Sequence, residues 1–245
     1  MVLALNNLLA AERLKLRHNR LIISCSSLAI ILPVMVIATD IFQGALPKYS
    51  IMGWVFRLAS LCQYFAYPVL SGFVLTFLIQ REYTDHTIIN MLTAPVTRTR
   101  LLIGKLIIWA TWHITMTLCY LAIVCLGAGI LYGSATLYGS FYEIASFIIK
   151  FGLLHLVTLT PIAWVAVLQR KNFYPSLLCT IIFTGIGFAG LYFPKFLGSL
   201  VPWSSVPLIT VPGMQVVPVL ATTSICICAF FGLFMAVYSF KHQDQ

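Results

Sequence analysis

The chain of 245 residues is 60% hydrophobic and only 9% charged, and its mean hydropathy is +0.97. About 25% of the residues of a soluble domain are charged, so this composition excludes a water-exposed globular protein and indicates an integral membrane protein. The net charge of +9 does not indicate nucleic-acid binding, because the basic residues stand in small groups at the ends of apolar runs.

Six apolar runs are long enough to cross the hydrocarbon core of a bilayer, which takes about 20 helical residues. They are, in chain order, Leu21 to Thr39, Leu58 to Ile79, Leu106 to Leu131, Phe147 to Leu168, Phe173 to Phe193 and Val217 to Phe240. The sequence therefore predicts an all-α integral membrane protein, with a single transmembrane domain of six helices over residues 1–245.

The first 20 residues have the pattern of an amphipathic helix that lies in the membrane interface. One predicted face is apolar, with Leu5, Leu8, Leu9 and Leu16, and another carries Arg13 and Arg17. Glu12 falls inside the apolar stripe. It is either a surface carboxylate beside Lys15 or the partner of a basic residue in a cytoplasmic loop, an ion pair that would hold this helix against the bundle.

The distribution of basic residues predicts the orientation, since short cytoplasmic loops are enriched in Lys and Arg. Eleven lie on one predicted side: Arg13, Lys15, Arg17, Arg20, Arg81, Arg98, Arg100, Lys105, Arg170, Lys171 and Lys241. Four lie on the other: Lys48, Arg57, Lys150 and Lys195. We therefore expect both termini in the cytoplasm.

An apolar segment rich in proline, Leu197 to Pro218, separates the fifth and sixth runs. Prolines at this density interrupt any continuous helix. The segment is either an extracellular loop or a partly buried re-entrant segment whose backbone is covered by protein.

Polar residues concentrate in one internal stretch, "REYTDHTIINMLTAPVTRTRLLIGK", from Arg81 to Lys105. Thr84 and Asp85 are good N-caps, and Ile88, Met91 and Leu92 form a short apolar face. Because Ala94 precedes a proline, the short helix should end there. Such a helix either docks on a partner subunit or belongs to a plain connection between two spans.

This stretch resembles the corresponding loop of permease subunits in type-2 ABC exporters. The residues that carry the resemblance are Glu82, the Tyr83 to Leu92 helix, Pro95, Arg98 and Gly104–Lys105. His86–Thr87 departs from the Gly-Thr that often precedes the helix in that family. The N-terminal "LLAAERLKLRHN", the six spans and the Pro-rich segment are also similar. In size and character the chain resembles bacterial permeases that protect against lantibiotics and bacitracin-like peptides.

The resemblance implies a membrane subunit that pairs with a second permease copy and with two ATPase subunits. It implies a cytoplasmic coupling helix whose residues contact the ATPase, namely Tyr83, Thr84, Asp85, His86, Thr87, Ile88, Met91 and Leu92, with Glu82 bracing the elbow before that helix. It also implies interface ion pairs among Glu12, Arg98 and Lys105. "GKLIIW" lacks the remaining residues of a phosphate-binding loop. We therefore expect no enzymatic activity and no cofactor in this chain, with ATP and Mg²⁺ bound by the partner.

The expected role is ATP-driven export, from a bacterial cytoplasmic membrane, of an amphipathic antimicrobial peptide, as in lantibiotic self-immunity. The alternatives are export of a lipid, glycan or other hydrophobic drug, and an ATP-independent transporter or channel. An ATP-independent transporter or channel would require paired charges near the membrane midplane or an inverted repeat, and we identify neither in the sequence. An intramembrane enzyme is disfavoured because no nucleophile–base set occurs.

Ionisable residues inside the predicted spans are candidate functional groups. His113 and His155 lie in the third and fourth spans. Each is either a neutral hydrogen-bonding residue between helices or a residue that contacts cargo or relays protons. Asp40 and Glu143 lie near the outer boundary, where we expect both to be solvated.

Overall fold

The computed structural model describes residues 10, 12, 14, 16, 19–43, 49–84, 97–169 and 173–242, with the backbone alone for residues 82–84. Within these residues the regular structure is entirely helical: α2 (Arg20–Phe42), α3 (Ile51–Leu61), η1 (Cys62–Ala66), α4 (Tyr67–Thr84), α6 (Arg98–Tyr132), α7 (Ser134–Thr158), α8 (Thr160–Leu168), α9 (Tyr174–Ala189), η2 (Gly190–Tyr192), α10 (Lys195–Leu200), α11 (Pro202–Thr210) and α12 (Pro218–His242). The all-α prediction is confirmed.

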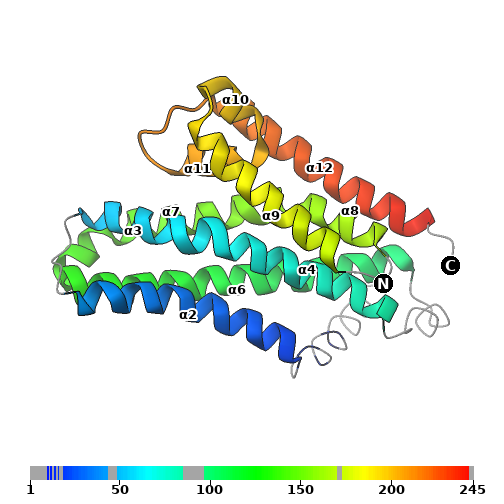
Figure 1. The fold of residues 1–245 in the computed structure, drawn as a ribbon, viewed down its shortest axis with the longest axis horizontal. Helices are drawn as coiled ribbons and strands as arrows, with labels where there is room; N and C mark the ends of the chain where they lie inside the picture. Colours follow the sequence, from blue (N-terminus) through cyan, green and yellow to red (C-terminus); the bar gives the residue numbers. More distant parts are fainter. Residues whose placement is uncertain are drawn as a thin grey trace.

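Six stretches of the described chain are long and apolar enough to cross a membrane, as predicted. They are Arg20–Phe42, Ile51–Arg81, Arg98–Tyr132, Ser134–Leu168, Tyr174–Tyr192 and Pro218–His242. The second and fourth are central: 67% and 56% of their most apolar windows are buried, against 22–33% for the other four. Figure 1 shows the long helices running alongside one another, with the end of α4, the start of α6 and the end of α12 at the same end of the bundle.

Several helices extend well beyond the apolar runs that predicted them. The second span begins at Ile51, where the Ser50 hydroxyl caps α3 by accepting from Gly53 N at 3.2 Å, and the helix continues to Thr84. The fourth begins at Ser134, directly after Gly133 ends α6 at a φ of +84°. A glycine suits this position because side chains disfavour positive φ. Hydropathy marks the lipid-crossing part of a helix and does not report where its hydrogen bonding ends.

The fourth span is broken at Leu159. The ring of Pro161 removes a backbone donor, so α7 ends at Thr158 and α8 starts at Thr160 with the proline in its first turn. The hydroxyl of Thr160 donates to the Val157 carbonyl at 2.9 Å, and the Trp203 indole donates to the Thr158 carbonyl at 3.1 Å. The carbonyls exposed by the break are therefore satisfied by a side chain of α8 and one of α11.

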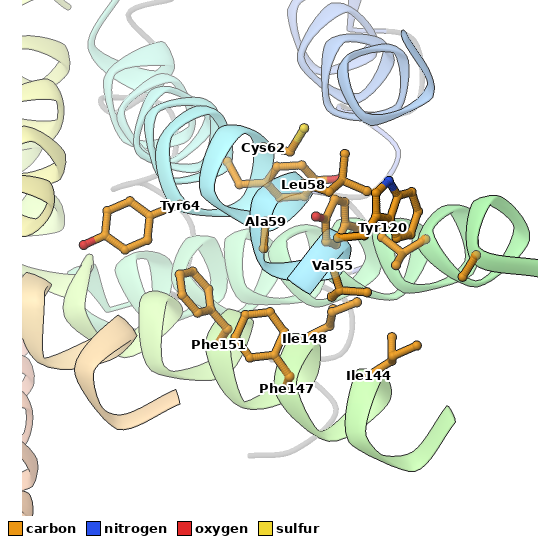
Figure 2. Packing of buried hydrophobic residues seen from close by; sticks show 14 of the residues in the cluster. Val55, Leu58, Ala59, Cys62, Tyr64, Tyr120, Ile144, Phe147, Ile148 and Phe151 are labelled. Atoms are coloured by element: carbon orange, nitrogen blue, oxygen red, sulfur yellow. The ribbon is translucent and has the colours of Figure 1, made fainter. Parts of the chain in front are cut away.

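The buried apolar core forms two clusters along the bundle. One joins α3, η1, α6 and α7, and its largest fully buried side chains include Trp54, Leu58, Tyr120, Ile148 and Phe151. Figure 2 shows the α7 side chains of this cluster facing those of α3, with Tyr64 extending away from the others. The second cluster joins α4, α6, α8 and α12.

The Pro-rich segment is helical in α10 and α11, whereas residues 211–217, between α11 and α12, are not helical. Pro202 starts α11 and Pro218 starts α12, both at positions where the missing N–H has no helical partner. Helix α11 packs against α7, α9 and α12. The Trp203 ring stacks on Phe183 at 4.0 Å, and Ser204 and Ser205 are completely buried. Helix α11 is therefore covered by protein, the condition that the re-entrant alternative requires, whereas residues 212–215 are exposed.

Candidate functional site: the α4–α6 end of the bundle and the polar residues buried behind it

The predicted coupling residues lie at and beyond the end of α4. Glu82, Tyr83 and Thr84 are the last residues of this helix, so the second span does not end at Ile79 and Thr84 belongs to its final turn. The other predicted contact residues, Asp85, His86, Thr87, Ile88, Met91 and Leu92, lie outside the described residues. The chain is described again from Thr97, and Arg98 is the first residue of α6.

A buried ion pair lies close to this end of α6. Lys105 Nζ is 3.6 Å from Glu12 Oε2, and the two side chains are 3% and 5% exposed. Glu12 belongs to the N-terminal segment, so the pair joins that segment to α6 seven residues after Arg98. Burying either charge alone would carry a large desolvation penalty, and the attraction between the two opposite charges offsets part of that penalty. The surface-carboxylate alternative for Glu12 is therefore wrong in this structure.

His113 belongs to a hydrogen-bond chain that crosses three helices. The Trp109 indole donates to the Ser71 hydroxyl at 2.9 Å, and Ser71 Oγ lies 2.8 Å from His113 Nδ1. His113 Nε2 lies 3.0 Å from the Gly152 carbonyl, which can only accept. A neutral ring protonated at Nε2 satisfies both contacts. The chain ties α4 to α6 and α6 to α7.

The close approach of α6 and α7 at this point depends on Gly152. A Cβ added there would lie 2.5 Å from Thr117 Cγ2, well inside van der Waals contact. The missing side chain lets α7 come near enough for the Gly152 carbonyl to receive the His113 hydrogen bond. The Thr117 hydroxyl is already satisfied by the His113 carbonyl at 2.9 Å.

His155 is one turn further along α7, in an aromatic environment. The Phe151 ring meets it edge-on at 4.7 Å, and the Tyr64 ring lies at 6.0 Å. His155 is 5% exposed. With Tyr64, Thr184 and Trp203 it lines a small enclosed space between α7, α9 and α11. The structure thus separates the two histidines: His113 bridges α4, α6 and α7, whereas His155 faces the α9–α11 side.

Three polar residues at η1 and the start of α4 also bind neighbouring backbones, and sequence analysis did not select them. The Gln63 amide donates to the Ile148 carbonyl at 2.9 Å, Tyr64 to the Gly187 carbonyl at 2.8 Å, and Tyr67 to the Ala29 carbonyl at 3.0 Å. A π-helical turn changes the direction of side chains and is frequent at functional sites. The run "CQYFAYP" inside an apolar span was the signal that could have identified them.

The expectation that Asp40 is simply solvated was wrong. Asp40 Oδ2 pairs with the Arg57 guanidinium and accepts from the Trp54 indole at 2.9 Å. Asp40 lies near the end of α2, and Arg57 and Trp54 lie on α3. Helix α3 begins seven residues before the predicted span, so Trp54 and Arg57 lie on a helix and their side chains reach Asp40. Glu143 is exposed, as expected.

Residues 8–187 match the family model described as ABC-2 family transporter protein. Because this match covers most of the chain, the protein belongs to that family and is a multi-pass membrane subunit of an ABC transporter. Over 179 residues the chain is 28% identical to the bacitracin transport permease protein BCRB of Bacillus licheniformis. That similarity covers 71% of this chain and 84% of the relative.

Proposed function

We propose that this permease subunit exports an amphipathic peptide antibiotic, driven by ATP hydrolysis in a partner subunit. The observation that carries the proposal is the similarity to a bacitracin transport permease over 84% of that protein. The described residues buried between the helices support an amphipathic cargo, because aromatic rings and hydroxyls predominate over charged side chains among them. Charged side chains inside a pathway would favour small ions instead.

The division of labour follows from family membership and from the sequence. An ABC-2 permease works with ABC ATPase subunits. The chain has no phosphate-binding loop, so ATP and Mg²⁺ are bound by the partner and this chain is not itself an ATPase. We assign the contact to the coupling region, defined as Tyr83 to Leu92, and we assign Glu82 to the elbow that precedes it. The complex has two permease copies and two ATPase subunits.

The hydrogen bonds behind the coupling region provide a route for transmitting movement. Ser71 lies thirteen residues before the end of α4, or about 20 Å along the helix. A displacement of that helix end is transferred to α6 through Ser71 and Trp109, and to α7 through His113 and Gly152. Packed helices respond to such displacements as units because their interfaces are close-packed.

The proposed orientation places both termini and the coupling region in the cytoplasm of a bacterial cell. The excess of basic residues, eleven against four, supports it. Cargo then enters the complex from the membrane and leaves on the side where α10 and α11 lie.

The direct test is antibiotic resistance in a sensitive bacterium that expresses this chain with its cognate ATPase. We expect the minimum inhibitory concentration of bacitracin or a lantibiotic to rise several-fold, with no change for a small hydrophilic antibiotic. An ATPase with its phosphate-binding lysine substituted is the matched control, since the complex assembles without hydrolysis. Unchanged resistance to peptides, with full membrane levels of both subunits, would contradict the peptide cargo and favour a lipid, glycan or other drug.

A further inference from the structure

A groove of about 790 Å³ lies between the N-terminal segment and helices α2, α4 and α6. Its walls include Leu14 and Leu16 of that segment, Ile22 of α2, Leu78 of α4, and Ile107 and Trp112 of α6. Leu14 and Ile107, which lie at its edge, are 70% and 39% exposed, so the groove is open to the surroundings of the bundle. The volume falls in the range of about 300–1,000 Å³ typical of ligand sites.

The polar groups that line this groove are already satisfied within the protein. The hydroxyls of Thr111 and Thr115 donate to the carbonyls of Ile107 and Thr111, at 2.8 and 2.7 Å. The Trp112 indole donates to Ser26 Oγ at 2.9 Å. No wall offers an unused donor to a ligand among the described residues, so the part of a ligand that fills the groove must be apolar.

A basic residue lies beyond the end of the groove, on the same face of α6. Arg100 precedes Ile107 by seven residues and Thr111 by eleven, spacings that return to one side of a helix. Arg100 is half-buried, and no acidic side chain of the described residues pairs with it. Lys105, in contrast, is neutralised by Glu12.

The distances along α6 from Arg100 to the groove match the thickness of one leaflet of a bilayer. At about 1.5 Å per residue, Ile107 lies roughly 10 Å beyond Arg100 and Thr115 roughly 22 Å beyond it. The groove therefore extends over about 12 Å, within the roughly 15 Å of hydrocarbon in half a bilayer. A headgroup beside Arg100 would leave an attached acyl chain at the depth of the groove.

We propose that the groove binds one acyl chain of an anionic membrane phospholipid whose phosphate contacts Arg100. Basic positions between membrane helices on the cytoplasmic side are suited to anionic headgroups. The Glu12–Lys105 pair holds the wall that contains Leu14 and Leu16 in place, so the lipid also fastens the N-terminal segment to α6. The site does not depend on the proposed cargo or on its transport.

Trp112 provides a direct reporter, because bromine on an acyl chain quenches a nearby indole. Phosphatidylglycerol brominated in its chains is titrated into mixed micelles that contain the purified protein. We expect a saturable component of quenching on top of a linear one from surrounding lipid. Trp112→Phe removes the saturable component. The proposal would be overturned if the Trp112→Phe variant kept the whole saturable component of quenching, or if the wild-type protein showed no saturable component.

Filling the groove tests the position of the chain. Thr111→Phe places a ring in the groove and should abolish saturable quenching, whereas Thr222→Phe on the exposed side of α12 should preserve it. Thr111→Leu is a smaller substitution and supplies the same test if the phenylalanine variant is not recovered as a monodisperse protein. Saturable quenching equal to wild type in the groove variants would place the lipid elsewhere.

Changing the charge tests the headgroup. Arg100→Gln should raise the half-saturating lipid concentration about fivefold, the equivalent of the ~1 kcal/mol that one basic residue contributes near an anionic surface. Lys241→Gln, at the exposed end of α12, should leave it unchanged. Brominated phosphatidylcholine should bind more weakly, and free glycerol phosphate should not compete. Equal binding of the two lipids would overturn the anionic specificity.

Discussion

Gly232 of α12 lies directly on Pro161 at the break between α7 and α8. A Cβ on Gly232 would be 2.5 Å from the proline nitrogen and 2.8 Å from its Cα, and these are backbone atoms that cannot move aside cheaply. The contact brings the last helix against the broken fourth span. It means that α12 is positioned by the same proline that ends the hydrogen bonding of α7.

Gly232→Ala should therefore destabilise the subunit, by about 1–3 kcal/mol if the helices must separate to admit the methyl group. Thermal unfolding in detergent measures the effect as a lower apparent Tm. Gly185→Ala is the matched control, because no atom lies within 4 Å of the Cβ that it adds to α9. An equal Tm for both variants would show that the α12–Pro161 contact is not tight in the native protein.

The ion pair between Glu12 and Lys105 predicts strong coupling between two substitutions. Glu12→Gln or Lys105→Gln alone removes one of two opposite buried charges and should cost about 3–5 kcal/mol of stability. The double variant removes both charges and should recover most of the loss. Unfolding of the four proteins under one set of conditions gives the coupling energy. Additive losses in the double variant would mean that the two side chains do not depend on each other.

The hydrogen-bond chain through Ser71 predicts a local penalty for removing one hydroxyl. Ser71→Ala withdraws the hydroxyl that faces His113 Nδ1, and a buried polar group left unsatisfied costs about 1–3 kcal/mol, whereas the Trp109 indole keeps its hydrogen bond to the Ser71 carbonyl at 3.0 Å. Ser60→Ala is the control, since that exposed hydroxyl bonds only the Arg57 carbonyl within its own helix. We expect lower stability and lower transport for Ser71→Ala alone. Equal stability of the two variants would rule out a structural role for the hydrogen bonds that link Ser71, Trp109 and His113.

The orientation can be tested by labelling single cysteines with a thiol reagent that does not cross the membrane. In a background without the native cysteines, Ser134→Cys and Gln215→Cys should react from outside the cell, and Thr97→Cys only after permeabilisation. All three side chains are exposed in the structure, so access depends on the side of the membrane. The opposite pattern would invert the proposed topology.

The coupling region makes a prediction about assembly. Ile88→Asp or Leu92→Asp would introduce a charge into a contact that we expect to be apolar, so the ATPase should no longer co-purify. Thr97→Asp adds the same charge at an exposed N-cap and should not affect binding. Glu82→Ala should leave the complex assembled but lower transport per ATP hydrolysed. If the Asp variants bind the ATPase and transport as well as the wild-type protein, this stretch is only a connection between two spans.

Much of the fold follows from local sequence. Long runs without charges predict helices that cross a membrane, and all six runs lie in helices of the structure. The ends of those helices were not predictable in the same way. Helix α3 begins at a Ser50 cap and α7 at Gly133, both outside the apolar runs, because capping and backbone geometry end a helix independently of lipid solubility.

The polar residues illustrate the same limit. Glu12, Arg98 and Lys105 could be selected from sequence as ion-pair residues, yet the sequence did not decide whether Glu12 pairs with Lys105. Asp40 was assigned to solvent because the apolar run that follows it starts after Trp54 and Arg57. Gln63, Tyr64 and Tyr67 bind carbonyls on three other helices, and such pairings leave no trace in the spacing along one chain.

The sequence by itself determined the class of protein, the number of spans and the side with the basic residues. These properties depend on how each segment partitions between water and lipid, and that free energy is a sum over local residues. Only the tertiary structure decided which polar groups meet. Ser71, His113 and Gly152 are brought together by the way α4, α6 and α7 pack, and a glycine that allows one close approach determines where a hydrogen bond can form.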